Sequence, residues 1–176
     1  MKGVENKIQK AHISILMVCH GNICRSPMAE FVLKDMVQKS EDAWKHQNPQ
    51  PEFFIASAAT STEEIGNPVH HGTRSILRRH GIDTSGKHAR QMTRSDYKEY
   101  DYLIGMDQWN RKNMLRILGK DPGNKVSLLL DFAEQPRDIA DPWYTGNFDI
   151  TFDDILEGCE ALLAHIVSED RDRLYS

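Results

Sequence analysis

The sequence has few cysteines, no long apolar run and no excess of positive charge. Its 3 cysteines among 176 residues are an odd number without a disulfide-framework spacing, which favours a reduced, cytoplasmic compartment. No apolar stretch approaches the ~18 residues of a membrane span, and the N-terminus lacks the apolar core of a signal peptide. The net charge of -4 argues against nucleic acid or an anionic membrane as a partner.

Internal repeats, low-complexity tracts and a metal-binding pattern are absent as well. The spacing Cys19-x4-Cys24 with scattered histidines is a poor zinc pattern. The adjacent His70 and His71 fall on one predicted helix, so their side chains should point to different faces. We therefore expect no metal and no cofactor. The composition, 39% hydrophobic and 27% charged, is typical of one globular domain with its own core.

The most informative stretch is an apolar run, residues 13–18, that leads into a polar loop between Cys19 and Arg25. The five residues between them are enough for the backbone to surround one tetrahedral oxyanion. Gly21 and Asn22 tolerate positive φ, which lets successive N–H groups converge as an anion-binding nest. The loop is therefore a candidate phosphate site.

A helix is expected directly after this loop. Ser26 is a good N-cap and Pro27 suits the first helical turn. The free N–H groups and positive dipole end of such a helix face the loop, where they favour an anion and a cysteine thiolate. Arg25 adds a planar fork that matches two phosphate oxygens.

Apolar runs alternate with helical patterns along the rest of the chain. The expected strands cover residues 13–18, 52–58, 102–106 and 125–130. The expected helices cover residues 26–39, 68–80 with Asn67 as N-cap, a short stretch opened by Thr93 and Asp96, 107–118, and the apolar stripe from Phe152 to Val167. Residues 131–147 are expected to form a long loop. This alternation predicts an α/β fold with a parallel sheet covered by helices on both faces.

The loop resembles the signature V-C-x-G-N-I-C-R-S-P of the low-molecular-weight protein tyrosine phosphatase family, and its bacterial members in particular. Residues 18–27 match every fixed position. Further matches follow in the family's order: Ser57-Ala58-Ala59-Thr60, Glu64-Ile65-Gly66-Asn67-Pro68, Arg79-His80-Gly81, His88-Ala89-Arg90-Gln91, Gly105-Met106-Asp107 and Asp141-Pro142-Trp143-Tyr144. The resemblance implies a single-domain, three-layer α/β/α fold with strand order 2-1-3-4. An N-terminal tail, residues 1–12, would precede a phosphatase domain, residues 13–170.

The resemblance also implies the catalytic residues. Cys19 would attack phosphorus and form a phosphocysteine, while Arg25 binds the phosphoryl group. Asp141 would act as general acid and then as general base, since a leaving tyrosine phenolate with a pKa near ~10 needs a proton.

A second set of residues is implied to bind phosphate and support the loop: His20, Gly21, Asn22, Ile23, Cys24, Ser26, Ser57 and His88. Within this set, Asn22, Ser26, Ser57 and His88 would form a polar network that holds the loop in shape, and the Ser26 hydroxyl would stabilise the thiolate. Two roles remain open for Cys24, which is either a packing residue or the partner of Cys19 in a reversible, redox-sensitive disulfide.

The substrate implied by the resemblance is a phosphotyrosine-containing protein, with a bacterial tyrosine kinase as a candidate partner. Trp143 and Tyr144 would form a wall around the substrate ring. Glu63 stands where the opposite wall is often aromatic, which leaves that wall open, polar or differently built.

Four other functions fit the sequence less well. Protein-arginine phosphatases carry threonine where this chain has Ile23, and arsenate reductases need a further cysteine pair where this chain has only Cys159. A phosphate- or redox-sensing module without catalysis would be expected to lose Arg25 or Asp141, and both are present. A zinc-binding structural domain fits the sequence least.

Overall fold

The computed structural model describes residues 12–40 and 51–169, so residues 1–11 of the expected tail and residues 41–50 lie outside the described residues. The last residue of the expected tail, His12, belongs to the first strand. Four strands, β1 (His12–Cys19), β2 (Glu52–Ala59), β3 (Tyr102–Gly105) and β4 (Val126–Leu128), form one sheet. All neighbouring strands are parallel and the order is β2-β1-β3-β4, which confirms the predicted fold.

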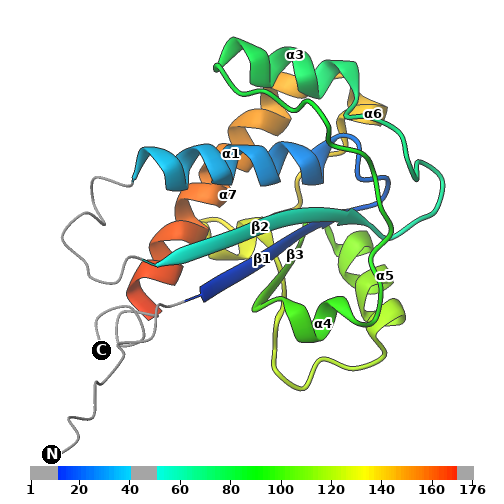
Figure 1. The fold of residues 1–176 in the computed structure, drawn as a ribbon, viewed down its shortest axis with the longest axis vertical. Helices are drawn as coiled ribbons and strands as arrows, with labels where there is room; N and C mark the ends of the chain where they lie inside the picture. Colours follow the sequence, from blue (N-terminus) through cyan, green and yellow to red (C-terminus); the bar gives the residue numbers. More distant parts are fainter. Residues whose placement is uncertain (1–11, 41–50, 170–176) are drawn as a thin grey trace, which may run out of the picture.

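Helices cover both faces of the sheet (Figure 1). They are α1 (Arg25–Lys39), α3 (His71–Arg79), α4 (Asp96–Glu99), α5 (Gln108–Leu118), α6 (Pro142–Thr145) and α7 (Phe148–Glu169), with a 3-10 turn η1 (Leu129–Phe132). Side chains of the central strand β1 alternate between two cores because successive residues of a strand face opposite ways. Ile15 and Met17 pack with α1, α3 and α7, whereas Leu16 and Val18 pack with α5.

Helix α7 follows the predicted apolar stripe. Its residues Phe152, Ile155, Cys159, Leu162 and Ile166 are all buried against the core. Helix α7 packs against α1 and η1, and α1 and α7 lie on the same face of the sheet (Figure 1).

The start of α3 differs from the prediction. The helix begins at His71, and its N-cap is His70, whose Nδ1 accepts a hydrogen bond from the Gly72 N–H at 3.0 Å. The segment before it stays extended because Pro68 pairs with His88 and the His70 N–H donates to the Ile23 carbonyl. The two histidine rings stack with centroids 4.2 Å apart, so the expectation of different faces is also wrong.

Helix α1 and strand β4 also differ from the prediction. Helix α1 begins at Arg25, and its N-cap is Cys24 rather than Ser26. Strand β4 ends at Leu128 because the Asp131 carboxylate accepts a hydrogen bond from the Leu128 N–H at 2.9 Å and turns the chain into η1. The long loop expected after it contains η1 and α6.

Candidate active site

The loop that follows β1 lies at the carboxyl end of the central strand, where the strand order reverses and ligands of open α/β sheets bind. Asn22 adopts the left-handed conformation with φ of 57°, as its residue type allowed. Gly21 does not have positive φ. A Cβ at this position would lie 3.3 Å from Glu64 Cγ, so glycine serves close packing here.

The carbonyl groups of this loop are bound from outside. The His20 carbonyl accepts from the Ser61 N–H at 3.0 Å, and the Ile23 carbonyl accepts from the His70 N–H at 2.8 Å. The Cys24 carbonyl accepts from the Thr73 hydroxyl at 3.2 Å. Because N–H and C=O of a trans peptide point in opposite directions, the N–H groups of these three peptides face away from the outer partners. This is the arrangement of an anion nest.

Cys19 ends β1 and is 3% exposed. Its sulfur lies 3.0 Å from the Ser26 hydroxyl and accepts a hydrogen bond from the Ser26 N–H at 3.4 Å. The Asn22 amide donates to the hydroxyls of Ser26 and Ser57, both at 2.8 Å. The structure therefore brings together Cys19, Ser26, Asn22 and Ser57 as expected.

His88 does not join this network. Its ring is exposed and its Nδ1 lies 3.1 Å from the Gly86 carbonyl. The neighbouring Lys87 takes the place instead: its ammonium lies 3.1 Å from Glu30 Oε2 and donates to the Ser57 carbonyl at 3.1 Å. Glu30 in turn accepts a short hydrogen bond from the Ser57 hydroxyl.

Glu30 is a buried carboxylate, 4% exposed, with two cations beside it. Burial alone would raise the pKa of Glu30, but Lys87, Lys34 and the Ser57 hydroxyl outweigh it and hold that pKa below its usual value. Burial lowers the pKa of Lys87, and the charge of Glu30 opposes this shift. An ion pair thus anchors the hydroxyl that positions Asn22.

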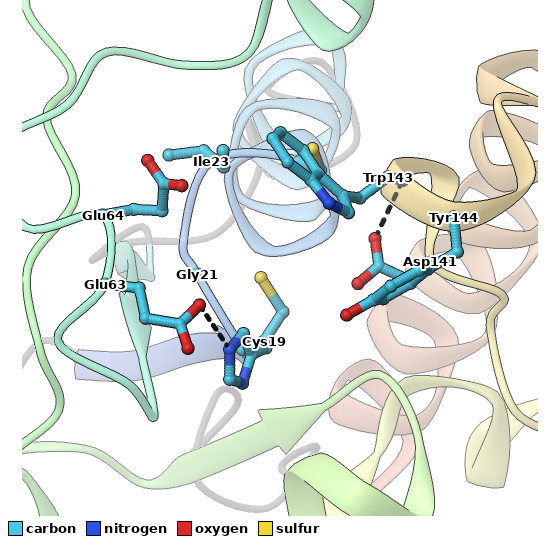
Figure 2. A pocket seen from close by; sticks show the side chains of 10 residues that line it. Cys19, Gly21, Ile23, Glu63, Glu64, Asp141, Trp143 and Tyr144 are labelled. Atoms are coloured by element: carbon cyan, nitrogen blue, oxygen red, sulfur yellow. Dashed lines mark hydrogen bonds and ion pairs between the residues drawn. The ribbon is translucent and has the colours of Figure 1, made fainter.

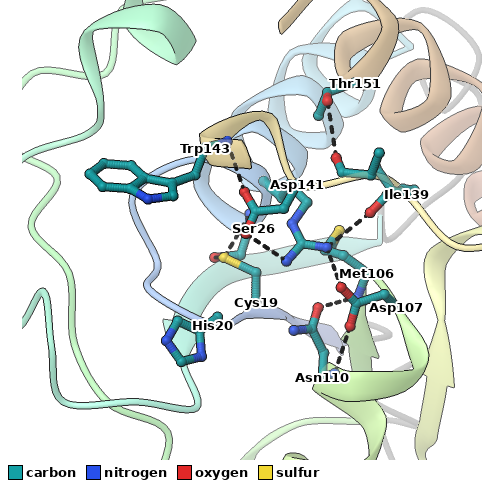
Figure 3. Close-up of polar contacts among 12 residues, drawn as sticks. Cys19, His20, Ser26, Met106, Asp107, Asn110, Ile139, Asp141, Trp143 and Thr151 are labelled. Carbon is teal, nitrogen blue, oxygen red and sulfur yellow. Dashed lines mark hydrogen bonds and ion pairs between the residues drawn. The ribbon is translucent and has the colours of Figure 1, made fainter. Parts of the chain in front are cut away.

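Arg25, the first residue of α1, is 2% exposed and is held by three oxygens. The residues that provide them, Asp107, Ile139 and Asp141, are labelled in Figure 3. Its Nη1 donates to Asp107 Oδ2 at 2.6 Å and to the Ile139 carbonyl at 2.9 Å, and its Nη2 donates to Asp141 Oδ2 at 3.2 Å. Burial opposes the charge of Arg25, but Cys19, Asp107 and Asp141 outweigh it and keep its pKa above the ordinary value. A buried cation therefore stands beside the cysteine sulfur.

Asp141 caps α6, whose first residue is Pro142. Its Oδ1 accepts a hydrogen bond from the Trp143 N–H at 3.1 Å, which leaves Oδ2 for Arg25. The short helix places Trp143 and Tyr144, which are 57% and 82% exposed, at the rim of the site.

These elements enclose a cavity of about 100 Å³ with Cys19 at its base (Figure 2). Asp141, Trp143 and Tyr144 line one side, and Glu63 and Glu64 line the other. The remaining lining residues are His20, Gly21, Ile23 and Cys24. The side of the cavity opposite the aromatic residues therefore carries two acidic side chains.

The sequence and the fold are similar to those of known proteins. The sequence profile of the family described as Low molecular weight phosphotyrosine protein phosphatase matches residues 14–172. The chain is 41% identical over 159 residues to the low molecular weight protein-tyrosine-phosphatase YfkJ of Bacillus subtilis, a match that covers 89% of this chain and 97% of that protein.

The chain belongs to the low molecular weight phosphotyrosine protein phosphatase family.

Other members support the assignment. The low molecular weight phosphotyrosine protein phosphatase of Gallus gallus is 38% identical over 157 residues, which cover 85% of this chain and 93% of that protein. The crystal structure of YfkJ is similar with a TM-score of 0.81 and 40% identity over 92% of this chain and 98% of that chain. The protein is thus a hydrolase, and its family supports protein tyrosine phosphatase activity on phosphotyrosine-containing proteins.

In this phosphatase, three residues near the site were not predicted as part of it. Asp107 was expected only to start a helix, yet its Oδ1 caps α5 through the Asn110 N–H at 2.7 Å while its Oδ2 holds Arg25. A signal was present, since a carboxylate directly after the predicted strand of residues 102–106 falls at the ligand-binding edge of a parallel sheet. Glu30 and Lys87 gave no comparable signal, because both sit in ordinary polar positions of the sequence.

Cys24 lines the same cavity as Cys19 but differs in its chemistry. Burial, with the nearby Cys19 and Asp141, raises the pKa of the Cys24 thiol to about 12, although Arg25 opposes the shift. Cys24 is therefore a neutral thiol at physiological pH and a poor nucleophile.

The described part of the phosphatase has no cluster of three or more His, Cys, Asp or Glu side chains suited to holding a metal ion. Across residues 12–40 and 51–169, no helix is long and apolar enough to cross a bilayer.

Proposed function

We propose that the protein hydrolyses phosphotyrosine through a phosphocysteine intermediate on Cys19. The observation that carries the proposal is the position of the Cys19 sulfur, within 3.4 Å of the Ser26 N–H and inside a loop whose carbonyls are bound from outside. A phosphoryl group above this sulfur meets the inward N–H groups, the N-terminal end of α1 and the Arg25 fork.

In the first step, the Cys19 thiolate attacks phosphorus, the S–P bond forms and the bond to the tyrosine oxygen breaks. The leaving phenolate takes a proton from the Asp141 carboxyl group. The phosphoryl oxygens compete with Asp141 for Arg25, and this competition frees Oδ2, now 3.2 Å from Nη2, for proton transfer.

In the second step, water attacks phosphorus and gives a proton to Asp141. The S–P bond breaks, which releases inorganic phosphate and restores the thiolate. The Ser26 hydroxyl, 3.0 Å from the sulfur, is positioned to donate a hydrogen bond to the departing thiolate.

Phosphotyrosine fits the cavity better than phosphoarginine does. Ile23, 8% exposed, lines the cavity and packs with Ala89 and Phe148, so this part of the wall is apolar. Trp143 and Tyr144 supply aromatic faces for a phenyl ring. A guanidinium would lose hydrogen bonds against this apolar and aromatic side of the cavity, and only the opposite side, with Glu63 and Glu64, would attract its charge.

Three finer assignments belong to the same proposal. A reversible Cys19–Cys24 disulfide is supported by the two sulfurs lining one cavity. The cytoplasmic location is supported by the free state of the three cysteines among the described residues. A tyrosine kinase as a partner rests on the bacterial relatives of the chain alone.

The test compares phosphate release from matched phosphotyrosine, phosphoserine and phosphoarginine peptides, with and without EDTA. We expect turnover of phosphotyrosine that EDTA leaves unchanged and that Cys19→Ser abolishes. Phosphotyrosine turnover by Asp141→Asn should fall by about 10²- to 10⁴-fold, with a much smaller loss on an aryl phosphate whose acidic phenol leaves without a proton.

Equal losses of Asp141→Asn on both substrates would contradict the role of general acid. Preference for phosphoarginine would contradict the interpretation of the walls. Phosphate binding without turnover of any substrate would favour a sensing module.

A further inference from the structure

A second cavity, of about 180 Å³, adjoins the catalytic cavity. It is lined by His20, Thr60, Ser61, Asn113, Arg116 and Ile117. His20 also lines the catalytic cavity, so the two cavities share this residue. None of the other five side chains takes part in the chemical steps above, although the Ser61 N–H binds the His20 carbonyl of the catalytic loop.

The second cavity contains a polar side chain whose hydrogen-bonding capacity is unused. The Thr60 hydroxyl is buried and has no hydrogen-bond partner within the described residues, and Thr60 as a whole is only 9% exposed. Buried polar groups of folded proteins are nearly always paired, so such an exception calls for an explanation. A ligand atom in the cavity would supply it if the Thr60 side chain turns its buried Oγ1 toward the cavity.

The charge of the second cavity is positive. Arg116 is exposed on α5 and makes no ion pair with any residue in the described ranges. Glu63 Oε2 lies 3.0 Å from His20 Nε2, and Glu63 lines the catalytic cavity but not the second cavity. A guanidinium, an amide and two hydroxyls suit a carboxylate or a phosphate.

A position in the last turn of α5 would by itself favour a cation at residue 116, because it opposes the negative end of the helix dipole. The dipole does not account for the unpaired Thr60 hydroxyl in the same cavity. The two observations together indicate an anion site.

The wall of the second cavity is fixed to the catalytic loop. The Thr60 N–H donates to the Cys19 carbonyl at 2.9 Å, and the Ser61 N–H donates to the His20 carbonyl at 3.0 Å. A substrate side chain bound there therefore lies at a fixed distance from the nucleophile, Cys19. An extended peptide advances by ~3.3–3.6 Å per residue, so a residue close to the phosphotyrosine in sequence reaches an adjoining cavity.

We propose that the second cavity binds an acidic side chain of the substrate, close in sequence to the phosphotyrosine. The proposal rests on the proposed function and adds a preference to it. The opposite wall, with Glu63 and Glu64, repels acidic residues. The phosphatase should therefore prefer an acidic residue on one side of the phosphotyrosine only, and a neutral or basic residue on the other.

The test measures kcat/KM for phosphotyrosine peptides in which a single aspartate is moved along an alanine background. We expect one or two positions to raise kcat/KM about 5- to 10-fold over the all-alanine peptide, with the gain reduced at high salt. Arg116→Glu should reverse the preference at those positions from aspartate to lysine. Thr60→Val, which keeps the side-chain shape, should reduce the gain from aspartate.

The matched control is Lys112→Ala, because Lys112 is an exposed cation on the same helix that lies over the Trp109 ring, away from the second cavity. It should keep the preference of the wild type. A preference that survives Arg116→Glu, or that disappears equally in Lys112→Ala, would overturn the proposal.

A phosphotyrosine without flanking residues separates the two proposals. Turnover of this compound with no preference among the peptides would refute the second cavity as a subsite while the proposed function stands. Absence of turnover of every phosphotyrosine substrate would refute the proposed function itself.

Discussion

Asp107→Asn separates the two tasks of one carboxylate. In the wild type, Oδ1 of Asp107 caps α5 and Oδ2 binds Arg25 Nη1 at 2.6 Å. Asparagine is as good an N-cap as aspartate, so its single oxygen can still accept from the Asn110 N–H. Its NH₂ group then faces Nη1, and two donors stand opposite each other.

The magnitude follows from the bond that is lost. A hydrogen bond to a charged group contributes about 1.5–3 kcal/mol, and Arg25 is 2% exposed, so water replaces little of it. Arg25 keeps the Ile139 carbonyl and Asp141, but its fork loses one of the contacts that fix its orientation. If the lost energy appears in the transition state, kcat/KM for phosphotyrosine falls about 10- to 150-fold.

The assay is kcat/KM on a phosphotyrosine peptide, together with inhibition by inorganic phosphate and the midpoint of urea unfolding. We expect catalysis and phosphate inhibition to weaken together. The unfolding midpoint should fall as well, because the buried Arg25 loses a partner in the folded state. Asp138→Asn is the matched control, since Asp138 accepts from the Gln108 N–H at the same helix start without contacting Arg25. Unchanged kcat/KM and phosphate inhibition in Asp107→Asn, with reduced stability, would refute the reasoning and leave Asp107 as a helix cap only.

Three further predictions concern the supporting structure. Lys87→Met removes one of the two cations beside the buried Glu30. The free energy of unfolding in urea should therefore fall by about 3 kcal/mol, and kcat should fall as well. His88→Ala should change the free energy of unfolding by less than about 0.5 kcal/mol. Glu30→Gln should lower the free energy of unfolding relative to the wild type by its full amount above the ordinary glutamate pKa of ~4.3. This difference should shrink as pH falls through the depressed pKa of Glu30. A difference that does not depend on pH would contradict the ion pair. Gly72→Ala should destabilise the protein by about 1–3 kcal/mol despite the helix preference of alanine, because a Cβ there would lie 2.5 Å from the Phe148 ring; an unchanged unfolding midpoint would show that the ring moves freely.

The sequence predicts well what depends on short-range pattern. The loop from Cys19 to Arg25, the strand alternation and the stripe of the last helix are each set by neighbouring residues, and the structure contains all of them. The start of α3 at His71 was mispredicted at Asn67-Pro68 because hydrogen bonds from distant segments keep the chain extended there. Local capping preference is weak against such tertiary contacts.

The polar network shows the other limit. His88 and Lys87 are adjacent in sequence, and only one of them can face inward on an extended segment. The choice between them depends on Glu30, 57 residues earlier, which provides a buried negative charge for the lysine. Likewise, the second role of Asp107 depends on Arg25, which lies in another strand–helix unit.

The outward hydrogen bonds of the loop carbonyls have a consequence for folding order. The loop is continuous in sequence, but its outer partners are Ser61, His70 and Thr73, which follow β2 in the chain. A chain that has formed only β1 and α1 therefore carries the whole phosphate-binding motif without the constraints that turn its N–H groups inward. We expect the ability to bind phosphate to arise late in folding, after the segment from β2 to α3 has docked, so that the unfolded and half-folded chain exposes Cys19 as an ordinary thiol.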